Sequence, residues 1–344
     1  MRLALCIRGV DEAELRQKEF YWQDWLALQH VADQVEFVSH PRQLRGQFDA
    51  AVVWWWNYLW LWGPVLRARR IPILAVGVFD VDTFADLSFP KRLLKRRGIP
   101  FARLHAMVSQ YEIDRAARFG FPMDRVRYAP HAIDGNFYVA QLRPSTAPPY
   151  VLNIGWHEES NLRRKMVFEL LEAFAAVPAR FPDVRLVLAG RHGDGAARLQ
   201  QHAQSLGIAH HVDFPGEVTR EAKLALLQGC SLYCQVSHYE GFGLATAEAL
   251  SCATPVLVSR VGAVPEVVGD CGAYVDEIST AGIRTGLMRC LATLPALREQ
   301  AQRGAQRMRE RFSCARRRAD FAALLRELLA DRSTAPTAIQ GNVN

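Results

Sequence analysis

The chain has 344 residues, of which half are apolar and 22% are charged, and its formal net charge is +7. This composition is typical of a globular protein, and the length is typical of two domains that each have a core of their own. The basic residues are dispersed and no nucleic-acid reading motif accompanies them, so we expect no nucleic acid partner. The positive charge still permits an anionic ligand or an anionic membrane surface.

Seven Cys residues, an odd number without a C-x-x-C pair, favour a reducing compartment over a disulfide framework. The first residues, MRLALCIRGVDEAE, become charged too early for a secretory signal. Residues 50–66, AAVVWWWNYLWLWGPVL, come nearest to a membrane span, but the run falls short of about 20 residues and contains Asn57 and Gly63-Pro64. We therefore expect a cytoplasmic protein that is either soluble or peripheral at the inner face of the membrane.

The first half of the chain alternates short apolar runs of strand type with amphipathic helical segments. Strands are predicted at residues 3–7, 35–38, 51–55, 71–79, 103–109 and 126–129. Helices are predicted at residues 11–31, 83–97 and 111–119. This alternation predicts a mostly parallel sheet that is covered on both faces. Residues 141–149, QLRPSTAPP, contain three Pro and no periodicity, which indicates a linker.

The second half repeats the scheme. Strands are predicted at residues 151–155, 185–189, 211–214, 232–236, 255–259 and 273–275. Helices are predicted at residues 164–181, 195–206, 220–228, 244–252, 295–311 and 316–329. We expect an α/β protein with domains at residues 1–140 and 150–311, a terminal helix at 312–330 able to pack back on the first domain, and a disordered tail at 331–344.

The most informative stretch is residues 237–268, SHYEGFGLATAEALSCATPVLVSRVGAVPEVV. Glu240 ends an apolar run, and the glycines on both sides of Phe242 let backbone N–H groups approach a ligand at a helix N-terminus, where anions are favoured. Glu248 is the only charge on the following helix, roughly 8–10 Å from Glu240 along the axis. Two acceptors flanking an anion site suit a nucleotide-sugar. The alternative is a surface Glu on an ordinary αβ turn.

The run EGFGLATAEAL followed by ATPVLVSRVGAVPEVV resembles the E-x7-E segment of retaining family-4 glycosyltransferases. SQYEIDRAARFGFPMDRVRYAPHAID at 109–134 and LVLAGRHGDG at 186–195 also resemble that family, so the resemblance covers about residues 100–330. It implies the GT-B fold, in which two Rossmann-like, doubly wound domains face a cleft. The N-terminal domain would then bind the acceptor, and the C-terminal domain would bind the nucleotide-sugar donor.

The resemblance also implies roles for individual residues. Glu240 would contact the donor sugar, and Glu248 would hold the nucleotide ribose. Lys165 matches the family's diphosphate-binding Lys, whereas Trp156 stands where the family has an Arg, so that either Arg163 or Arg164 supplies the missing cation. The implied catalytic residues are Glu240, Lys165 and Arg164, and the implied donor-binding residues are Gly241, Phe242, Gly243, Leu244, Glu248 and Arg163.

The acceptor side is predicted less specifically, from Asp80 and His131. Asp80 follows Phe79, where the family often has His, and a lone His131 is also compatible with a structural role. Asp80 and Asp82 form a D-x-D pattern, a metal motif of the other main glycosyltransferase fold, but the surrounding chain does not resemble that fold. We expect no metal and no cofactor apart from the donor substrate.

Two further segments of the sequence allow two interpretations. The Trp run at residues 54–62, together with KRLLKRR at 91–97, forms either a membrane-facing surface for a lipid-linked acceptor or a core strand and a solvated helix.

The resemblance predicts a retaining, metal-independent glycosyltransferase that moves a sugar from a nucleotide-diphosphate donor to a glycan or lipid-linked acceptor, in bacterial surface polysaccharide biosynthesis. One alternative is a sugar-nucleotide epimerase or hydrolase of the same fold. Another is a catalytically silent GT-B binding protein, which the departures at Trp156 and Phe79 favour and the intact Glu240, Glu248 and Lys165 disfavour. The base, sugar, acceptor, linkage and oligomeric state stay open.

Overall fold

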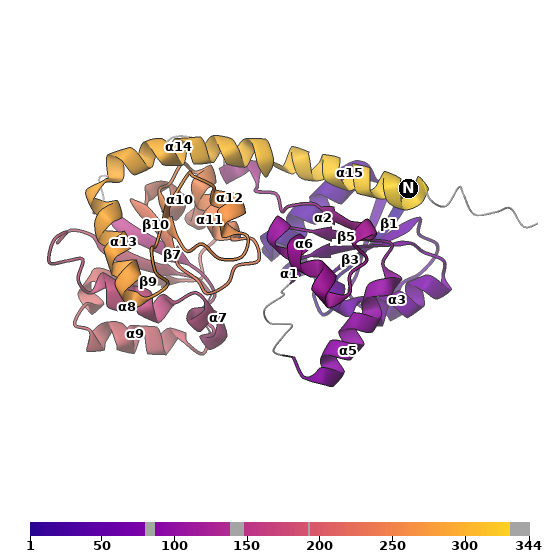
Figure 1. The fold of residues 1–344 in the computed structure, drawn as a ribbon, viewed down its shortest axis with the longest axis horizontal. Helices are drawn as coiled ribbons and strands as arrows, with labels where there is room; N and C mark the ends of the chain where they lie inside the picture. Colours follow the sequence, from indigo (N-terminus) through magenta and orange to yellow (C-terminus); the bar gives the residue numbers. More distant parts are fainter. Residues whose placement is uncertain (80–86, 138–147, 192, 331–344) are drawn as a thin grey trace, which may run out of the picture. The chain divides into compact units, whose positions relative to one another are not determined.

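The computed structural model describes residues 1–79, 87–137, 148–191 and 193–330. The chain divides into two compact units: unit 1 is Met1–Ala132 with Cys314–Asn344, and unit 2 is Ile133–Ser313 (Figure 1). The predicted linker, apart from its last two residues, and the predicted tail lie outside the described residues. The first unit ends before the predicted linker, because Ile133 already donates its backbone N–H to Phe312 O within unit 2, at 2.8 Å.

Unit 1 contains a six-stranded sheet in which every neighbouring pair is parallel, in the order β2-β1-β3-β4-β5-β6. Its strands are β1 (Arg2–Cys6), β2 (Gln34–Val38), β3 (Ala50–Trp54), β4 (Ile73–Gly77), β5 (Leu104–Met107) and β6 (Val126–Tyr128). All six were predicted. Alternate side chains of β3 enter different cores: Ala51 and Val53 face one, and Ala50, Val52 and Trp54 face the other.

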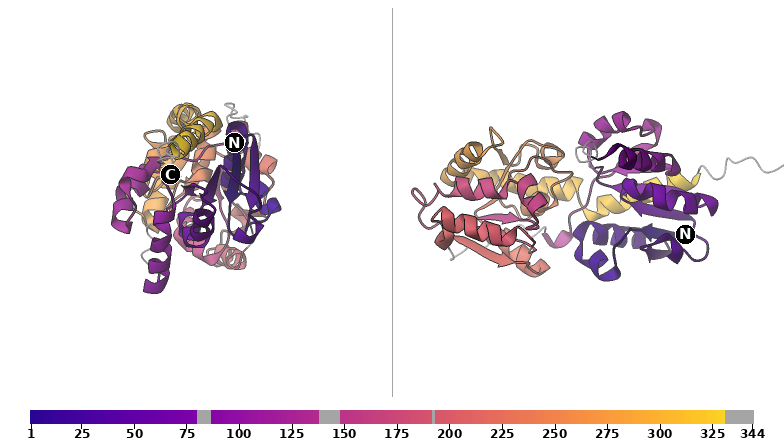
Figure 2. Two further views of the ribbon diagram at one scale, coloured as in Figure 1. Left: turned by 90° about the vertical axis from the view of Figure 1, so that its right-hand side faces the viewer. Right: turned by 90° about the horizontal axis from the view of Figure 1, so that it is seen from below.

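Helices cover both faces of this sheet (Figure 2). They are α1 (Glu12–Gln17), α2 (Glu19–Val31), α3 (Leu59–Ala68), α5 (Phe89–Gly98), α6 (Gln110–Ala116) and α15 (Cys314–Ala330). The single helix predicted at 11–31 is broken at Lys18, whose backbone is extended and both ends α1 and begins α2. Helix α3 was not predicted, because its aromatic residues and its internal Gly63-Pro64 hide the helical periodicity.

The Trp-rich run is part of the core of unit 1. Trp54 and Trp62 are 0% exposed and Trp56 is 6% exposed, with Trp56 packed edge-on against Phe79 at 4.6 Å between ring centroids. These three indoles are therefore core residues, as the alternative interpretation of the run predicts, whereas Trp55 and Trp60 are partly exposed. Among the described residues, no helix combines the length and the apolar character needed to span a bilayer.

Helix α15 belongs to unit 1 through a buried ion pair. Arg317 is 2% exposed and forms two hydrogen bonds with Asp24 of α2, from Nε to Oδ1 at 2.7 Å and from Nη2 to Oδ2 at 2.8 Å. Trp54 Nε1 donates to the same carboxylate at 3.0 Å, and Arg317 Nη1 donates to Ala129 O at 2.6 Å. A charge this deeply buried requires such partners, so α15 is fixed to both α2 and the sheet.

His131 lies beside this network, stacked on Trp54 with an interplanar angle of 2° and 5.5 Å between ring centroids. It is 3% exposed, and burial lowers its pKa well below the ordinary value for histidine, with the charge of Arg317 lowering it further. A covered, neutral ring packed on indole does not present a hydrogen-bonding group to an acceptor. Burial and stacking are typical of a structural histidine, and the assignment of His131 to the acceptor site stays a prediction.

His105 makes the stability of unit 1 sensitive to acid. It is 2% exposed on β5, and burial lowers its pKa from 6.5 to about 4, although a backbone contact at Ile99 partly opposes this shift. Because the folded state binds the proton more weakly than the unfolded state, stability is complete above about pH 6.5 and declines as the pH falls towards about 4. The expected total loss is about 3 kcal/mol, which urea unfolding at a series of pH values will measure.

The variant His105→Leu is expected to flatten much of this decline, with His131 responsible for part of what remains, since burial lowers its pKa in the same direction. His210→Gln is the control, because His210 lies on the surface of unit 2. If the free energy of unfolding of His105→Leu declines with falling pH as steeply as that of the wild type, His105 is not the source of the acid sensitivity.

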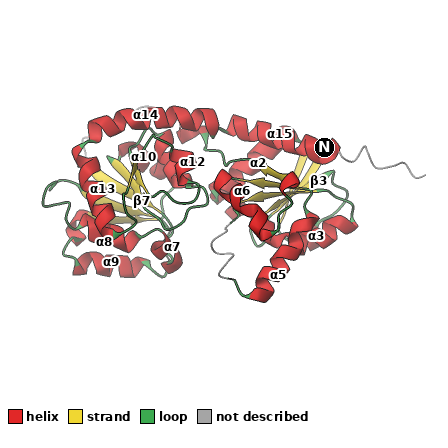
Figure 3. Cartoon of the chain, viewed as in Figure 1, coloured by secondary structure: helices red, strands yellow, loops and turns green. Residues whose placement is uncertain are grey.

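Unit 2 is a second doubly wound unit with helices on both faces of its sheet (Figure 3). Its strands are β7 (Tyr150–Ile154), β8 (Arg185–Ala189), β9 (Val212–Gly216), β10 (Leu232–Gln235), β11 (Val256–Val258) and β12 (Ala273–Tyr274). Its main helices are α7 (Glu159–Arg164), α8 (Val167–Phe174), α9 (Ala196–Ser205), α10 (Arg220–Gly229), α11 (Leu244–Ser251), α12 (Val264–Val268), α13 (Thr280–Ala292) and α14 (Leu294–Arg311). All strand pairs are parallel, in the order β12-β11-β10-β7-β8-β9.

The order of strands in unit 2 reverses between β7 and β10. From β7 the chain builds outward through β8 and β9, then returns to place β10 on the other side of β7. In doubly wound sheets, ligands bind beyond the carboxyl ends of the strands at this reversal. The segments that follow β7 and β10 are therefore where a site is expected.

Candidate functional site

The segment after β7 brings two cations to the carboxyl edge of the sheet. Helix α7 has only six residues, and Met166 then adopts a left-handed backbone with φ of 48° before α8 begins. The predicted single helix at 164–181 was wrong here, because that left-handed residue separates α7 from α8. The backbone N–H of His238 donates to Arg164 O at 2.8 Å, which ties this segment to the one after β10.

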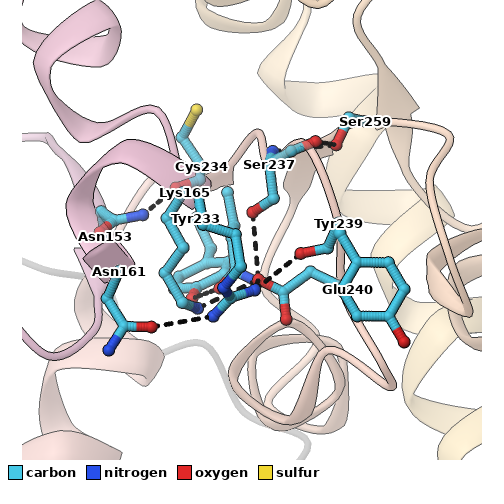
Figure 4. A network of polar contacts seen from close by, with 11 residues as sticks. Asn153, Asn161, Lys165, Tyr233, Cys234, Ser237, Tyr239, Glu240 and Ser259 are labelled. Atoms are coloured by element: carbon cyan, nitrogen blue, oxygen red, sulfur yellow. Dashed lines mark hydrogen bonds and ion pairs between the residues drawn. The ribbon is translucent and has the colours of Figure 1, made fainter. Parts of the chain in front are cut away.

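The carboxylate of Glu240 is the point where the two segments meet. Arg164 Nη1 lies 2.9 Å and Lys165 Nζ lies 3.2 Å from Glu240 Oε1, and Ser237 Oγ donates to the same oxygen at 3.1 Å. Figure 4 shows Lys165 and Ser237 pointing toward this oxygen, while the other carboxylate oxygen of Glu240 points away from these contacts. We call these four residues, Arg164, Lys165, Ser237 and Glu240, the Glu240 cluster.

The electrostatics of the Glu240 cluster favour a second anion. Burial alone would raise the pKa of Glu240, but the charges of Lys165 and Arg164 outweigh burial and hold the pKa below its ordinary value. Burial lowers the pKa of Lys165, and Glu240 limits that shift by stabilising the ammonium. When all three groups are ionised, two cations and one carboxylate leave one net positive charge at the edge of the sheet.

The backbone of Glu240 is also fixed. Ala263 N donates to Glu240 O at 3.0 Å, and a Cβ on Gly262 would lie 2.0 Å from that oxygen, so only glycine fits there. The hydroxyl of Ser259 accepts from Ser237 N at 3.0 Å and donates to Ser237 O at 2.8 Å. The segments after β10 and β11 thus hold the carboxylate in one orientation, as a preorganised site requires.

Beyond Glu240, the chain turns into α11 as predicted. Gly243 precedes the helix in the left-handed conformation, with φ of 85°, which a side-chain-bearing residue adopts at a cost. Phe242 is 3% exposed and packs edge-on against Phe312 at 5.5 Å, so its ring anchors the turn rather than lining the surface. Gly241 and Leu244 are partly exposed at the helix N-terminus, where backbone N–H groups lack intrahelical partners.

Glu248 has a cationic partner that was not predicted from the sequence. Lys223 Nζ of α10 lies 2.7 Å from Glu248 Oε1, and the Glu248 side chain is only 4% exposed. Lys223 also lies 5.0 Å from the ring of Phe137. One signal was available, because a cation in the first turn of a helix opposes the helix dipole and therefore calls for a nearby anion.

The other residues singled out in the sequence, Arg163, Trp156 and Asp80, are not part of the Glu240 cluster as the structure describes it. Arg163 has a side chain 70% exposed and pairs with Glu159 at 2.7 Å, so Arg164, and not Arg163, is the arginine at Glu240. Trp156 is 41% exposed directly after β7, with the Arg191 guanidinium 5.9 Å from its ring centroid. Asp80 and the D-x-D pattern lie outside the described residues.

Residues 146–302, which contain this whole site, match the family model described as glycosyl transferases group 1. O-antigen chain mannosyltransferase B of Escherichia coli is 30% identical over 238 residues, covering 61% of this chain and 61% of the relative. A GDP-mannose-dependent alpha-(1-6)-phosphatidylinositol dimannoside mannosyltransferase of Mycobacterium tuberculosis is 37% identical over 153 residues, covering 44% of this chain and 35% of the relative. The matches therefore span only about one to two thirds of these relatives.

Solved structures resemble nearly the whole chain. HepE of Anabaena, in complex with UDP and glucose, has a TM-score of 0.77 at 18% identity and covers 95% of this chain and 100% of its own. Sucrose-phosphate synthase of Thermosynechococcus elongatus has a TM-score of 0.76 at 18% identity and covers 96% and 99%. The two six-stranded parallel sheets are thus those of the GT-B fold, as predicted, and residues 146–302 are similar to group 1 glycosyl transferases.

Proposed function

We propose that this protein is a retaining, metal-independent glycosyltransferase of family 4 that uses a nucleotide-diphosphate sugar. The observation that carries the proposal is the convergence of Arg164, Lys165 and Glu240 where the strand order of unit 2 reverses. In this proposal Glu240 and Glu248 are the two carboxylates of the E-x7-E motif. Glu240 contacts the donor sugar, and Glu248, oriented by Lys223, accepts from the ribose hydroxyls.

The cations of the cluster would act on the diphosphate. As the bond between the sugar and the phosphate oxygen breaks, negative charge grows on the leaving phosphate, and a preorganised Lys165 and Arg164 stabilise it there. The acceptor hydroxyl forms the new bond on the face from which the phosphate leaves, and its proton passes to that phosphate. Gly241, Phe242, Gly243 and Leu244 would place their backbone against the sugar and the diphosphate.

The setting proposed is bacterial surface polysaccharide biosynthesis, at the cytoplasmic face of the membrane, with a glycan or lipid-linked acceptor. Two mannosyltransferases among the relatives make GDP-mannose the first donor to test, and UDP in the HepE structure makes UDP-glucose the second. Asp80 stays a proposed acceptor contact.

Donor binding is expected to change the fluorescence of Trp156. Trp156 is the single Trp of unit 2 in the sequence, and it follows Gly155, where an added Cβ would lie 3.4 Å from Lys165 Cδ. The experiment titrates GDP-, UDP-, ADP- and dTDP-sugars into the protein, with Trp156→Phe as the blank for the Trp residues of unit 1. In the variant Glu248→Ala, the binding free energy should weaken by about 1–3 kcal/mol.

Glu299→Ala is the matched control, since Glu299 is an exposed carboxylate on α14. If no nucleotide-sugar changes the emission or the melting temperature at millimolar concentration, the donor site is refuted. Wild-type affinity in the Glu248 variant would instead refute only the ribose role. Product analysis then separates transfer, with retained anomeric configuration, from hydrolysis or epimerisation.

A further inference from the structure

Helix α5 of unit 1 carries large apolar side chains on its surface. Phe89 is 69% exposed, Leu93 is 40% exposed and Leu94 is 45% exposed. Among the described residues, few other large apolar side chains reach such exposure, and those are scattered over both units. A cluster of this kind on one helix marks a surface that contacts something else.

The helical repeat places these side chains on one face. Phe89 and Leu93 are four residues apart, as are Pro90 and Leu94, so the four side chains form two adjacent rows on the outward side. The exposure of Phe89, Leu93 and Leu94 shows that both rows face away from the body of unit 1 over the first turns, and the row of Pro90 and Leu94 meets the unit only at Gly98, where a Cβ would lie 2.5 Å from Trp60 N. The apolar strip is therefore directed away from the unit that holds the helix.

The same helix is strongly basic. Its sequence, FPKRLLKRRG, contains no carboxylate, and its cations are Lys91, Arg92, Lys95, Arg96 and Arg97. Lys91 is exposed beside the apolar residues in the first turn, and Arg97 is exposed at the C-terminal end. Apolar side chains with exposed cations beside them are the composition of a helix that lies in the plane of a membrane interface.

Helix α5 is attached to unit 1 near its C-terminal end. Arg96 donates to Phe119 O at 3.1 Å and to Arg118 O at 3.0 Å, which anchors the C-terminal half of the helix. The N-terminal turn stands away from the sheet of unit 1 (Figure 1). The end that projects thus carries Phe89 and Pro90 together with Lys91.

We propose that α5 docks unit 1 on the surface of an anionic phospholipid bilayer. Phe89, Leu93 and Leu94 enter the boundary between headgroups and acyl chains, and the exposed Lys91 and Arg97 pair with lipid phosphates. Exposed apolar side chains with cations beside them match the interface of an anionic leaflet, where acyl chains meet the phosphate headgroups. This inference names the surface and the lipid class for the membrane contact in the proposed function, but it depends on α5 and not on sugar transfer.

The test is flotation of the full chain with vesicles of phosphatidylcholine, either alone or mixed with phosphatidylglycerol. The wild type is expected to float with the anionic vesicles only, and salt should weaken this binding. Lys91→Gln/Arg97→Gln should reduce the partition coefficient by roughly 25-fold, since each cation near an anionic leaflet contributes about fivefold. Phe89→Ser/Leu93→Ser/Leu94→Ser should reduce it by roughly 100-fold.

Matched controls leave α5 intact. Met123→Ser/Ile278→Ser removes exposed apolar residues elsewhere, and Arg298→Gln/Arg303→Gln removes exposed cations of α14, so both should float like the wild type. Absence of flotation, or full flotation of the α5 variants, would overturn the proposal. So would equally strong binding to soluble polyglutamate that survives the Ser substitutions, because that result indicates an acidic protein. The change of Trp156 fluorescence on nucleotide binding is measured in the α5 variants as well. If it is kept while flotation fails, the membrane proposal fails and the donor site does not.

Discussion

Replacing Lys165 with Ala is expected to lower the turnover number for sugar transfer by roughly 10²- to 10³-fold, as the loss of one preorganised charge-stabilising donor does elsewhere. The reason is geometric: Lys165 Nζ lies 3.2 Å from Glu240 Oε1 and is only 13% exposed, so water cannot replace it without rearrangement. The measurement is initial-rate kinetics at saturating donor, with the donor identified by the fluorescence titration. The Michaelis constant should change less than the turnover number, because the charge on the phosphate grows during bond cleavage.

Arg163→Gln is the control for the Lys165 variant. It removes a cation two residues away that points to Glu159 and not to Glu240, and it should leave turnover within a few-fold of wild type. Equal losses in both variants would indicate that the general positive charge of the segment matters, and not the Glu240 cluster. EDTA should leave the wild-type rate unchanged, whereas a strict metal requirement would direct attention back to the D-x-D pattern.

Arg317→Ala is expected to reduce the free energy of unfolding of unit 1 by about 3–5 kcal/mol, which is typical when one partner of a buried ion pair is removed. The substitution leaves Asp24 charged and 1% exposed, with Trp54 Nε1 at 3.0 Å as the remaining hydrogen-bond donor described here. Chemical denaturation followed by Trp fluorescence measures this loss, because seven of the eight Trp residues belong to unit 1.

The double variant Asp24→Asn/Arg317→Met should recover most of that stability, since it removes both charges and keeps a carbonyl oxygen for the Trp54 indole N–H. Arg316→Ala is the neighbouring control: its side chain is 59% exposed and pairs with Asp320 at 3.5 Å, so a change of about 0.5 kcal/mol or less is expected. If the double variant is no more stable than Arg317→Ala, the loss comes from packing of α15 rather than from the uncompensated charge.

The strands of both units could be predicted from the sequence, because buried parallel strands are short, continuous apolar runs with few other interpretations. The helices were less certain. Thr280–Ala292 was missed because Gly282 and Gly286 and several polar residues obscure its apolar face, and α7 was missed because the left-handed Met166 has no signature in the sequence. The local pattern of apolar and polar residues predicts a helix or a strand only where that pattern differs from the pattern of a loop.

The residues of the candidate site also fall into those that spacing along the chain predicts and those that it does not. Glu240, Glu248 and Lys165 lie in segments whose spacing carries information, and the structure places each at the carboxyl edge of the sheet in unit 2. The choice between Arg163 and Arg164, and the pairing of Lys223 with Glu248, depend on how separate segments meet in space. No spacing along the chain contains that information, and only tertiary packing supplies it.

The position of α15 also has a consequence for the order in which the protein matures on the ribosome. Unit 2 is one continuous stretch, Ile133–Ser313, and all of its strands have been synthesised before α15 emerges. Unit 1 begins the chain but includes Cys314–Ala330, which carries the partner of the buried Asp24 carboxylate. Of the two units, the one whose synthesis starts earlier is therefore completed later, and a chain truncated before Arg317 contains a finished unit 2 and a unit 1 that lacks its closing helix.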